Sequence, residues 1–345
     1  MEDDVMATAG AVFVETNEVD NRVLAFPRDA QGALGEPVDY TTGGSGTAVP
    51  HLPSQGSVVL SQDRRFLLVA NAASNDISVF AVEGAQLRPI ATAASGGESP
   101  RSVTELGGTV YVLNSGKPAV AAFRLSDAGL VPIAGADTAL SSVSADPAQI
   151  GLSPDGSIIV VTERGTDAIE AFAVTPDGSL GEPIIVPSSG PTPYGFAFTS
   201  DGTLVVTEAF RAEKGAAAAS TYAMKDGALT PVTRSLPNGM SEICWAVVTN
   251  DGRYVFTTNF AESTVSRFAL AGDGSITLED ASAGDIGDRR PGLRDAGLSE
   301  DSMYLFAIDA DGGRVMSWSI REGGALTPLT PRDGLPTTIA GLAAS

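Results

Sequence analysis

Short apolar segments alternate with turn residues along the whole chain, and they recur in phase. Seven segments end in an aromatic residue, at successive intervals of 43 to 54 residues: Phe26, Phe80, Phe123, Phe172, Tyr222, Phe268 and Trp318. In five of these units an apolar run leads into an Asp-containing turn, at Asp63, Asp155, Asp201, Asp251 and Asp301. Asp-Gly after an apolar run indicates a tight turn, because Gly tolerates positive φ. A period near 50 residues indicates a repeat architecture.

Each repeat reads as four short strands. In the fourth repeat these are PAQIGLS (147–153), SIIVVTE (157–163), DAIEAFAV (167–174) and EPIIVPS (182–188). Four strands in about 50 residues are typical of one blade of a β-propeller. The sequence therefore predicts an all-β, seven-bladed β-propeller of four-stranded antiparallel blades. We expect the propeller to form one domain over residues 10–345, preceded by an N-terminal tail at residues 1–9.

The two ends of the repeat array complement each other. The segment AVFVETN (11–17) matches the second strand of a blade, and PTTIAGLAAS (336–345) matches a first strand. We expect the C-terminal strand to join the N-terminal blade and close the ring, which removes exposed sheet edges. A closed ring predicts a monomer.

The length and the charge of the chain limit the number of domains and the classes of binding partner that are expected. The length of 345 residues would by itself suggest two domains. The repeats indicate instead seven units of about 49 residues each within one domain. Acidic residues outnumber basic ones 42 to 21, for a net charge of −21, so nucleic acid and anionic membrane are unfavourable partners. The acidic start MEDDV lacks the basic region of a secretory signal, and no apolar window is long enough to span a membrane. We expect a soluble, cytoplasmic protein that binds a small molecule.

Cysteine and histidine side chains are scarce in this sequence. The chain has one cysteine, Cys244, and one histidine, His51, which exclude an intramolecular disulfide and a multi-histidine metal site. The segment IDADGGR (308–314) contains DxDG but lacks the distant Glu of a calcium loop. We therefore expect no cofactor and no metal.

Two sets of polar positions are expected at one mouth of the propeller channel. Each predicted second strand ends in a polar residue: Asn17, Asn71, Asn114, Glu163, Glu208, Asn259 and Asp309. Asn and Asp in such places are commonly turn residues that bond their own backbone. Glu is a weaker turn former, so Glu163 and Glu208 are the candidate catalytic residues, each as a general base.

The predicted first strands and one long loop supply the candidate substrate-binding residues. These are Gln55, Arg101, Gln149, Tyr194, Trp245 and Arg294, together with Arg211 in the Gly- and Ala-rich loop 208–220. Arginine binds carboxylate or phosphate in a bidentate manner. Other interpretations stay open: hydrogen bonds between blades for the glutamines, core packing for the aromatic residues, and salt bridges for the arginines. Cys244 is expected to be a small buried hydrophobe rather than a nucleophile.

The repeats LSPDGSIIVVTERGTDAIEAFAVTPDGSL and VTNDGRYVFTTNFAESTVSRFALAGDGSI resemble the lactonase family of seven-bladed propellers. That family includes bacterial 6-phosphogluconolactonases and fungal carboxymuconate-lactonising enzymes. The motifs NAASNDISVF, DPAQIGLSPDG and PYGFAFTSDG resemble its 3-carboxymuconate cyclase-like members. The resemblance implies a hydrolase acting on a small anionic lactone. A muconate-cycloisomerising isomerase or lyase and a non-enzymatic binding platform remain the alternatives, because one fold hosts many activities.

Overall fold

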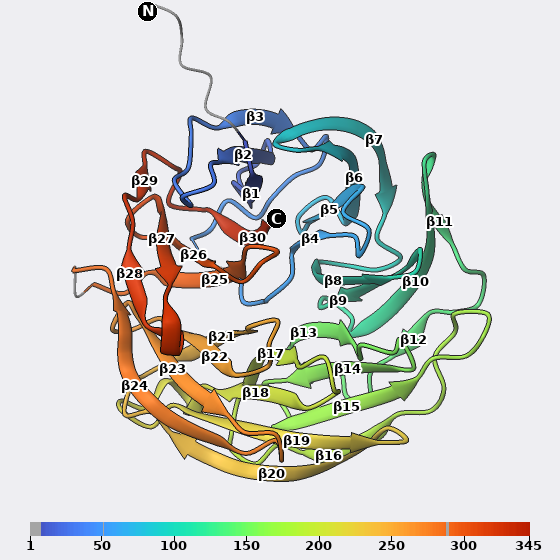
Figure 1. Ribbon diagram of the computed structural model, residues 1–345. Helices are drawn as coiled ribbons and strands as arrows, with labels where there is room; N and C mark the ends of the chain where they lie inside the picture. The colour runs from blue at the N-terminus through green and yellow to red at the C-terminus, as the bar shows by residue number, and fades with distance from the viewer. Residues whose placement is uncertain (1–7, 51, 288–289) are drawn as a thin grey trace, which may run out of the picture.

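The protein is a closed ring of seven β-sheets, seen along its axis in the computed structural model of Figure 1. The structure describes residues 8–50, 52–287 and 290–345. Within them, every sheet has four consecutive antiparallel strands, and two sheets carry a further short strand. The innermost strands β4, β8, β13, β17, β21, β25 and β30 surround the centre of the ring (Figure 1). The predicted fold is therefore confirmed.

The strands of blades 2 to 7 run from the axis outward in chain order, and in blade 1 the C-terminal strand takes the innermost place. Blade 1 has β30 (Ala340–Ala344), β1 (Gly10–Glu15), β2 (Arg22–Arg28) and β3 (Val38–Thr41). Blade 2 has β4 (Val58–Leu60), β5 (Phe66–Asn71), β6 (Asp76–Glu83) and β7 (Gln86–Ala94). Blade 3 has β8 (Pro100–Leu106), β9 (Thr109–Asn114), β10 (Ala119–Ser126) and β11 (Gly129–Pro132), with β12 (Thr138–Ala139) also on β10.

The other four blades repeat this order. Blade 4 has β13 (Pro147–Leu152), β14 (Ile158–Glu163), β15 (Ala168–Ala173) and β16 (Ile184–Pro187). Blade 5 has β17 (Pro193–Phe198), β18 (Leu204–Glu208), β19 (Ala218–Lys225) and β20 (Ala228–Pro237), with the 3-10 turn η1 (Phe210–Ala212). Blade 6 has β21 (Ile243–Val248), β22 (Tyr254–Asn259), β23 (Thr264–Leu270) and β24 (Ile276–Asp285). Blade 7 has β25 (Leu293–Leu298), β26 (Tyr304–Asp309), β27 (Arg314–Ile320), η2 (Glu322–Gly324), β28 (Leu326–Pro328) and β29 (Arg332–Asp333).

The repeated aromatic residues form the packing between blades. All seven are at most 1% exposed, and each lies in a separate apolar cluster shared by two neighbouring blades. Trp318 on β27, for example, packs with Phe256 of β22 in the preceding blade. Burying a large aromatic side chain stabilises a protein by about 1.5–3 kcal/mol. The period of the sequence is thus the period of the blade interfaces.

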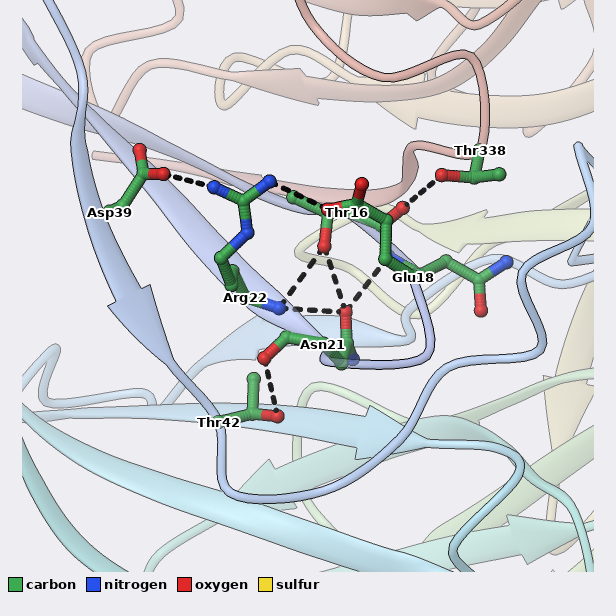
Figure 2. A network of polar contacts seen from close by, with 8 residues as sticks. Thr16, Glu18, Asn21, Arg22, Asp39, Thr42 and Thr338 are labelled. Atoms are coloured by element: carbon green, nitrogen blue, oxygen red, sulfur yellow. Dashed lines mark hydrogen bonds and ion pairs between the residues drawn. The ribbon is translucent and has the colours of Figure 1, made fainter.

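The ring closes as predicted, through the pairing of β30 with β1, in which Val12 lies opposite Ala344. Figure 2 shows a polar network that supports this closure. The hydroxyl of Thr338, just before β30, donates to the carbonyl oxygen of Thr16 at 2.7 Å. The guanidinium of Arg22 binds Glu18 at 2.6 Å and also binds Asp39 of β3. The first strand β1 and the last strand β30 therefore belong to one blade.

The predicted Asp turns join the first and second strands of five blades. In each turn a Ser or Thr hydroxyl two residues earlier donates to the Asp carboxylate, as Ser153 does to Asp155 at 2.6 Å. The backbone N–H of Ser157 donates to the same oxygen at 3.0 Å. These hydrogen bonds hold the pKa of Asp155 below its usual value. Among the described residues, no helix is long and apolar enough to cross a membrane.

Candidate functional site

Five of the inner strands share a register shift close to their first residues. In β8 the pairing with β9 shifts between Pro100 and Ser102, and β13, β17, β21 and β25 shift at the equivalent place. The residues inside these shifts are Arg101, Ala148, Tyr194, Gly195, Cys244, Trp245, Arg294 and Asp295. A β-bulge re-aims side chains out of the regular alternation. We call the end of the ring where the inner strands begin the mouth.

Two side chains bridge the ring just inside the mouth, between blades 2 and 6. The indole Nε1 of Trp245 donates to the carbonyl oxygen of Ser54 at 2.7 Å. The amide of Gln55 donates to the carbonyl oxygen of Ala246 at 2.9 Å and accepts from its N–H at 3.1 Å. Because these bonds join β21 to the segment before β4, Trp245 and Gln55 form a floor beneath the mouth. The amide of Gln55 is therefore engaged by backbone.

Three arginines from different blades gather around Tyr194. The guanidinium of Arg164, in the turn after β14, lies 4.9 Å from the centre of the Tyr194 ring. The charges of Arg101 and Arg294 also act on Tyr194, whose own ring lies 5.6 Å from that of Trp245. Burial raises the pKa of the Tyr194 phenol. The predicted residues Arg101, Tyr194, Trp245 and Arg294 are thus brought together, and Arg164 joins them.

Two carboxylates accompany the three guanidinium groups. Asp146 accepts from Arg101 at 3.0 Å and from Arg164 at 2.7 Å. Arg294 lies 3.5 Å from Asp311, and its guanidinium is 5.0 Å from the centre of the Phe260 ring. Burial, followed by the charge of Arg164, lowers the pKa of Arg101. The mouth therefore brings three guanidinium groups together with carboxylates that partly balance them, within a protein of net charge −21.

Several guanidinium N–H groups at the mouth could donate further hydrogen bonds. Among the described residues, Nε of Arg101 and both Nε and Nη1 of Arg294 are buried without a hydrogen-bond partner. A buried donor without a partner costs about 1–3 kcal/mol. An anion that accepts from these groups would recover that free energy, because charge-assisted hydrogen bonds to carboxylate or phosphate are strong.

Glu208, one of the two predicted catalytic residues, is enclosed in blade 5. It accepts hydrogen bonds from the hydroxyls of Ser220 and Ser235 at 2.6 Å each, and from the N–H of Gly190 at 2.9 Å. The side chain has no exposed surface, and burial raises its pKa despite these hydrogen bonds. These contacts tie β18 to the outer strands β19 and β20. A catalytic role for Glu208 stays a prediction.

Glu163, the other predicted catalytic residue, is paired with a second carboxyl group. It is fully buried at the end of β14, where it accepts a hydrogen bond from Thr166 and lies against Glu170 of β15. Burial raises the pKa of Glu163 to about 7, and the neighbouring Glu170 adds to the rise. Glu170 in turn accepts the N–H of Ser141 at 2.8 Å. The arrangement connects blade 4 to the loop before it, and the catalytic role of Glu163 also stays a prediction.

The remaining polar ends of the second strands also bond to nearby outer strands or loops. Asn71 binds Ser78 at 2.8 Å, and Asn259 binds Ser266 at 2.9 Å. Asp309 pairs with Arg314 at 2.6 Å. Turn and blade interactions thus account for the contacts of these three positions.

Gln149 and Arg211 lie apart from the arginine group in their contacts. The amide of Gln149 donates to the carbonyl oxygen of Phe196 at 3.0 Å and accepts its N–H at 2.6 Å, which connects blades 4 and 5. Arg211 is 65% exposed and forms an ion pair with Asp167. Substrate binding by either residue remains a prediction.

Cys244 is a poor nucleophile in this environment. Its thiol lies 3.1 Å from the carbonyl oxygen of Glu242, and burial raises its pKa. A thiol must ionise to attack, so the expected hydrophobic role fits its environment. His51 lies outside the described residues.

Sequence reasoning missed Asp146 and Phe260 as residues of the mouth. It placed Asp295 at the start of a first strand without a role, and it noted Arg164 only as a neighbour of Glu163. Asp146 precedes a proline at the start of an inner strand, a position that other blades fill with Ser99 or Thr192. That substitution by an acid was the available signal. In the described part of the chain, no group of three or more His, Cys, Asp or Glu is arranged to hold a metal.

Comparison with known proteins gives the family and the fold. The family model described as "Lactonase, 7-bladed beta-propeller" matches residues 5–131, 102–209 and 205–338. A 6-phosphogluconolactonase of Bacillus subtilis is 23% identical over 175 residues, which span 49% of this chain and 50% of that relative. A periplasmic gluconolactonase of Pseudomonas aeruginosa has a TM-score of 0.76 at 16% identity, over 97% of this chain and 98% of that one. A protein from Lactobacillus plantarum has a TM-score of 0.77 at 16% identity, over 97% and 99% of the two chains.

Proposed function

Because the chain belongs to the lactonase family of seven-bladed β-propellers, we propose that it hydrolyses a small anionic lactone at the arginine-lined mouth. The observation that carries the proposal is the group formed by Arg101, Arg164 and Arg294 around Tyr194. The unpartnered N–H groups of Arg101 and Arg294 supply hydrogen-bond donors for an anion. The relatives named for gluconolactones support the reaction class.

The geometry suggests how the residues divide the work. Arg101 and Arg164 already share one carboxylate, Asp146, so this pair is suited to hold the carboxylate or phosphate of a substrate. Arg294 carries two unpartnered nitrogens and is suited to polarise the lactone carbonyl and stabilise the oxyanion of the tetrahedral intermediate. The aromatic rings of Tyr194 and Phe260 hold Arg164 and Arg294 in place.

A panel of lactones tests the proposal. We expect the purified protein to open an anionic lactone, such as 6-phosphogluconolactone, faster than its uncharged counterpart. Removal of one charge-assisted contact with Arg101→Ala should raise KM for the anionic lactone by about tenfold or more. The control Arg124→Ala removes an arginine of β10 that binds Thr109 and the carbonyl oxygen of Asp177 instead. If the wild-type protein turns over none of the lactones above the buffer rate, the proposed function is wrong.

A cytoplasmic location and a monomeric state belong to the same proposal. The pairing of β30 with β1 supports the monomeric state because it closes the ring. Cell fractionation and size-exclusion chromatography test the two parts separately.

A further inference from the structure

Asp295 lies at the floor of the mouth, beside groups that the proposed function uses. It follows Arg294 on β25, inside the register shift between Leu293 and Ala296. Only 3% of the residue is exposed. Its Oδ2 accepts the backbone N–H of Gly341 at 3.0 Å, and the indole of Trp245, whose N–H donates to Ser54, lies nearby. Asp295 is therefore next to both the floor and Arg294, which has more unpartnered buried nitrogens than Arg101 or Arg164.

The charge of Asp295 reaches the surrounding residues of the mouth. It acts on the phenol of Tyr194 from β17 and on the thiol of Cys244 from β21, raising the pKa of both. From the side of blade 1 it faces Glu15, whose pKa it also raises. Arg294 is the cation that acts on it most directly. A carboxylate at this place is thus electrostatically part of the mouth.

Asp295 is less enclosed by hydrogen-bond donors than Glu208, one of the two glutamates predicted from the sequence. Glu208 accepts three hydrogen bonds of 2.6–2.9 Å, two of them from serine hydroxyls. Each donor stabilises the charged form and makes the carboxylate a weaker base. Among the described residues, Asp295 accepts one hydrogen bond, from the backbone N–H of Gly341. Its geometry leaves it freer to take a proton.

We propose that Asp295 is the proton-accepting group of the lactone-hydrolysing site, an inference that rests on the proposed function. The carboxylate takes a proton from a water molecule while the water oxygen bonds to the lactone carbonyl carbon. The tetrahedral intermediate then breaks its bond to the ring oxygen, and Asp295 returns the proton to that oxygen. The product is the hydroxy acid, and the carboxylate is restored. Lactone and one water are consumed, so no other reactant is required.

The ionisation of Asp295 suits this step. Burial raises its pKa to about 7, and the Gly341 N–H and the charge of Arg294 oppose the rise without cancelling it. A base is most effective when its pKa is near the working pH. Burial raises the pKa of Glu15 to about 8, so this neighbour is mostly neutral at neutral pH. Its Oε1 and the hydroxyl of Ser57 are buried without a hydrogen-bond partner among the described residues.

The first test compares Asp295→Asn with Asp311→Asn. Asparagine can still accept the Gly341 N–H but cannot take a proton. We expect kcat to fall by about 100-fold or more with KM changed by less than about threefold. The rise of kcat/KM with pH, which has its midpoint near pH 7 in the wild-type protein, should disappear. Asp311→Asn also removes a negative charge beside Arg294, so it should change KM for the anionic lactone and keep the pH-dependent rise.

The second test does not depend on turnover. The protein has two tryptophans, so Trp318→Phe leaves Trp245 as the single tryptophan reporter beside Asp295. We expect its fluorescence to change with a midpoint near pH 7, and the change to be lost when Asp295→Asn is added. Glu15→Gln should leave this transition in place.

The outcomes separate the two claims. A wild-type protein without lactonase activity overturns the proposed function and the catalytic step, whatever the fluorescence shows. An active protein in which Asp295→Asn keeps kcat and its pH-dependent rise overturns only the role of Asp295. If Asp295→Asn loses both kcat and the fluorescence transition near pH 7, the result supports Asp295 as the proton acceptor.

Discussion

The indole nitrogen of Trp245 lies 2.7 Å from the carbonyl oxygen of Ser54, which connects β21 to the segment before β4 across the ring. Both groups are buried, so the hydrogen bond is protected from water. It joins two blades that are not neighbours, and it therefore holds the ring together from within while it forms the floor of the mouth.

Replacing Trp245 by Phe should destabilise the protein and loosen this floor. The substitution leaves the Ser54 carbonyl without its indole donor, which costs about 1–3 kcal/mol in addition to the lost packing. Urea denaturation measures the change. Trp318→Phe is the matched control, because Trp318 is equally buried but packs between blades 6 and 7. Equal losses in the two variants would show that the contact across the ring adds nothing.

The carboxylate of Asp146 competes with any anion for Arg101 and Arg164. Replacing Asp146 by Asn removes that charge, and we expect phosphate to bind about two- to tenfold more tightly, as measured by calorimetry. The same change should lower stability slightly, because the two guanidinium groups then repel without a shared partner. The two arginines hold the pKa of Asp146 below its usual value, so wild-type affinity should stay level near neutral pH. Weaker phosphate binding in the variant would contradict this account.

Glu163 should make the protein less stable as pH rises. The pKa of this buried carboxyl is raised from 4.5 to about 7 in the folded state, so folding is favoured while the group is protonated. Its stabilising contribution is complete below about pH 4.5 and is lost as the pH rises through about 7. Glu163→Gln should therefore match the wild-type protein near pH 5 and exceed its unfolding free energy by about 1–3 kcal/mol near pH 8.

Thermal and urea unfolding at the two pH values measure this difference, and Glu83→Gln on the surface strand end of β6 serves as a control for the loss of one negative charge. A variant less stable than the wild-type protein at the higher pH would contradict the prediction. Its kcat also tests the catalytic role that the sequence predicted for Glu163. A loss of about 100-fold supports that role, and a value near wild type assigns Glu163 to the blade.

The fold was predictable because its determinants repeat. The interblade aromatic residues, exemplified by Trp318, and turn residues such as Asp155 recur in nearly every unit, so each copy supports the interpretation of the others. The mouth was predictable only in part. Arg164 reaches Tyr194 from the next blade, and Asp146 is specific to one inner strand, so neither belongs to a repeated motif. The residues that donate hydrogen bonds to Glu208 are separated along the chain, so the sequence did not predict that they enclose its carboxylate.

The closing strand β30 depends on a glycine that packs against the adjacent blade. Gly341 has φ +65°, and a Cβ at this position would overlap the hydroxyl of Ser57 and approach the side chain of Val58 on β4. Gly84, at the turn between β6 and β7, has nearly the same φ of +62° but no atom within 4 Å of a built Cβ. A comparison of these two glycines therefore distinguishes the cost of the left-handed conformation from the cost of the steric contact with Ser57 and Val58.

Gly341→Ala should cost about twice as much stability as Gly84→Ala. The left-handed conformation alone costs about 1–2 kcal/mol for a residue with a Cβ, and both variants bear it. Gly341→Ala must in addition push β30 away from β4, which weakens the closure of the ring and adds about 1–3 kcal/mol. Urea denaturation measures both losses, and limited proteolysis should detach the C-terminal strand faster in Gly341→Ala. Equal destabilisation of the two variants would mean that β30 has room to shift and that the close contact with Ser57 does not limit the fold.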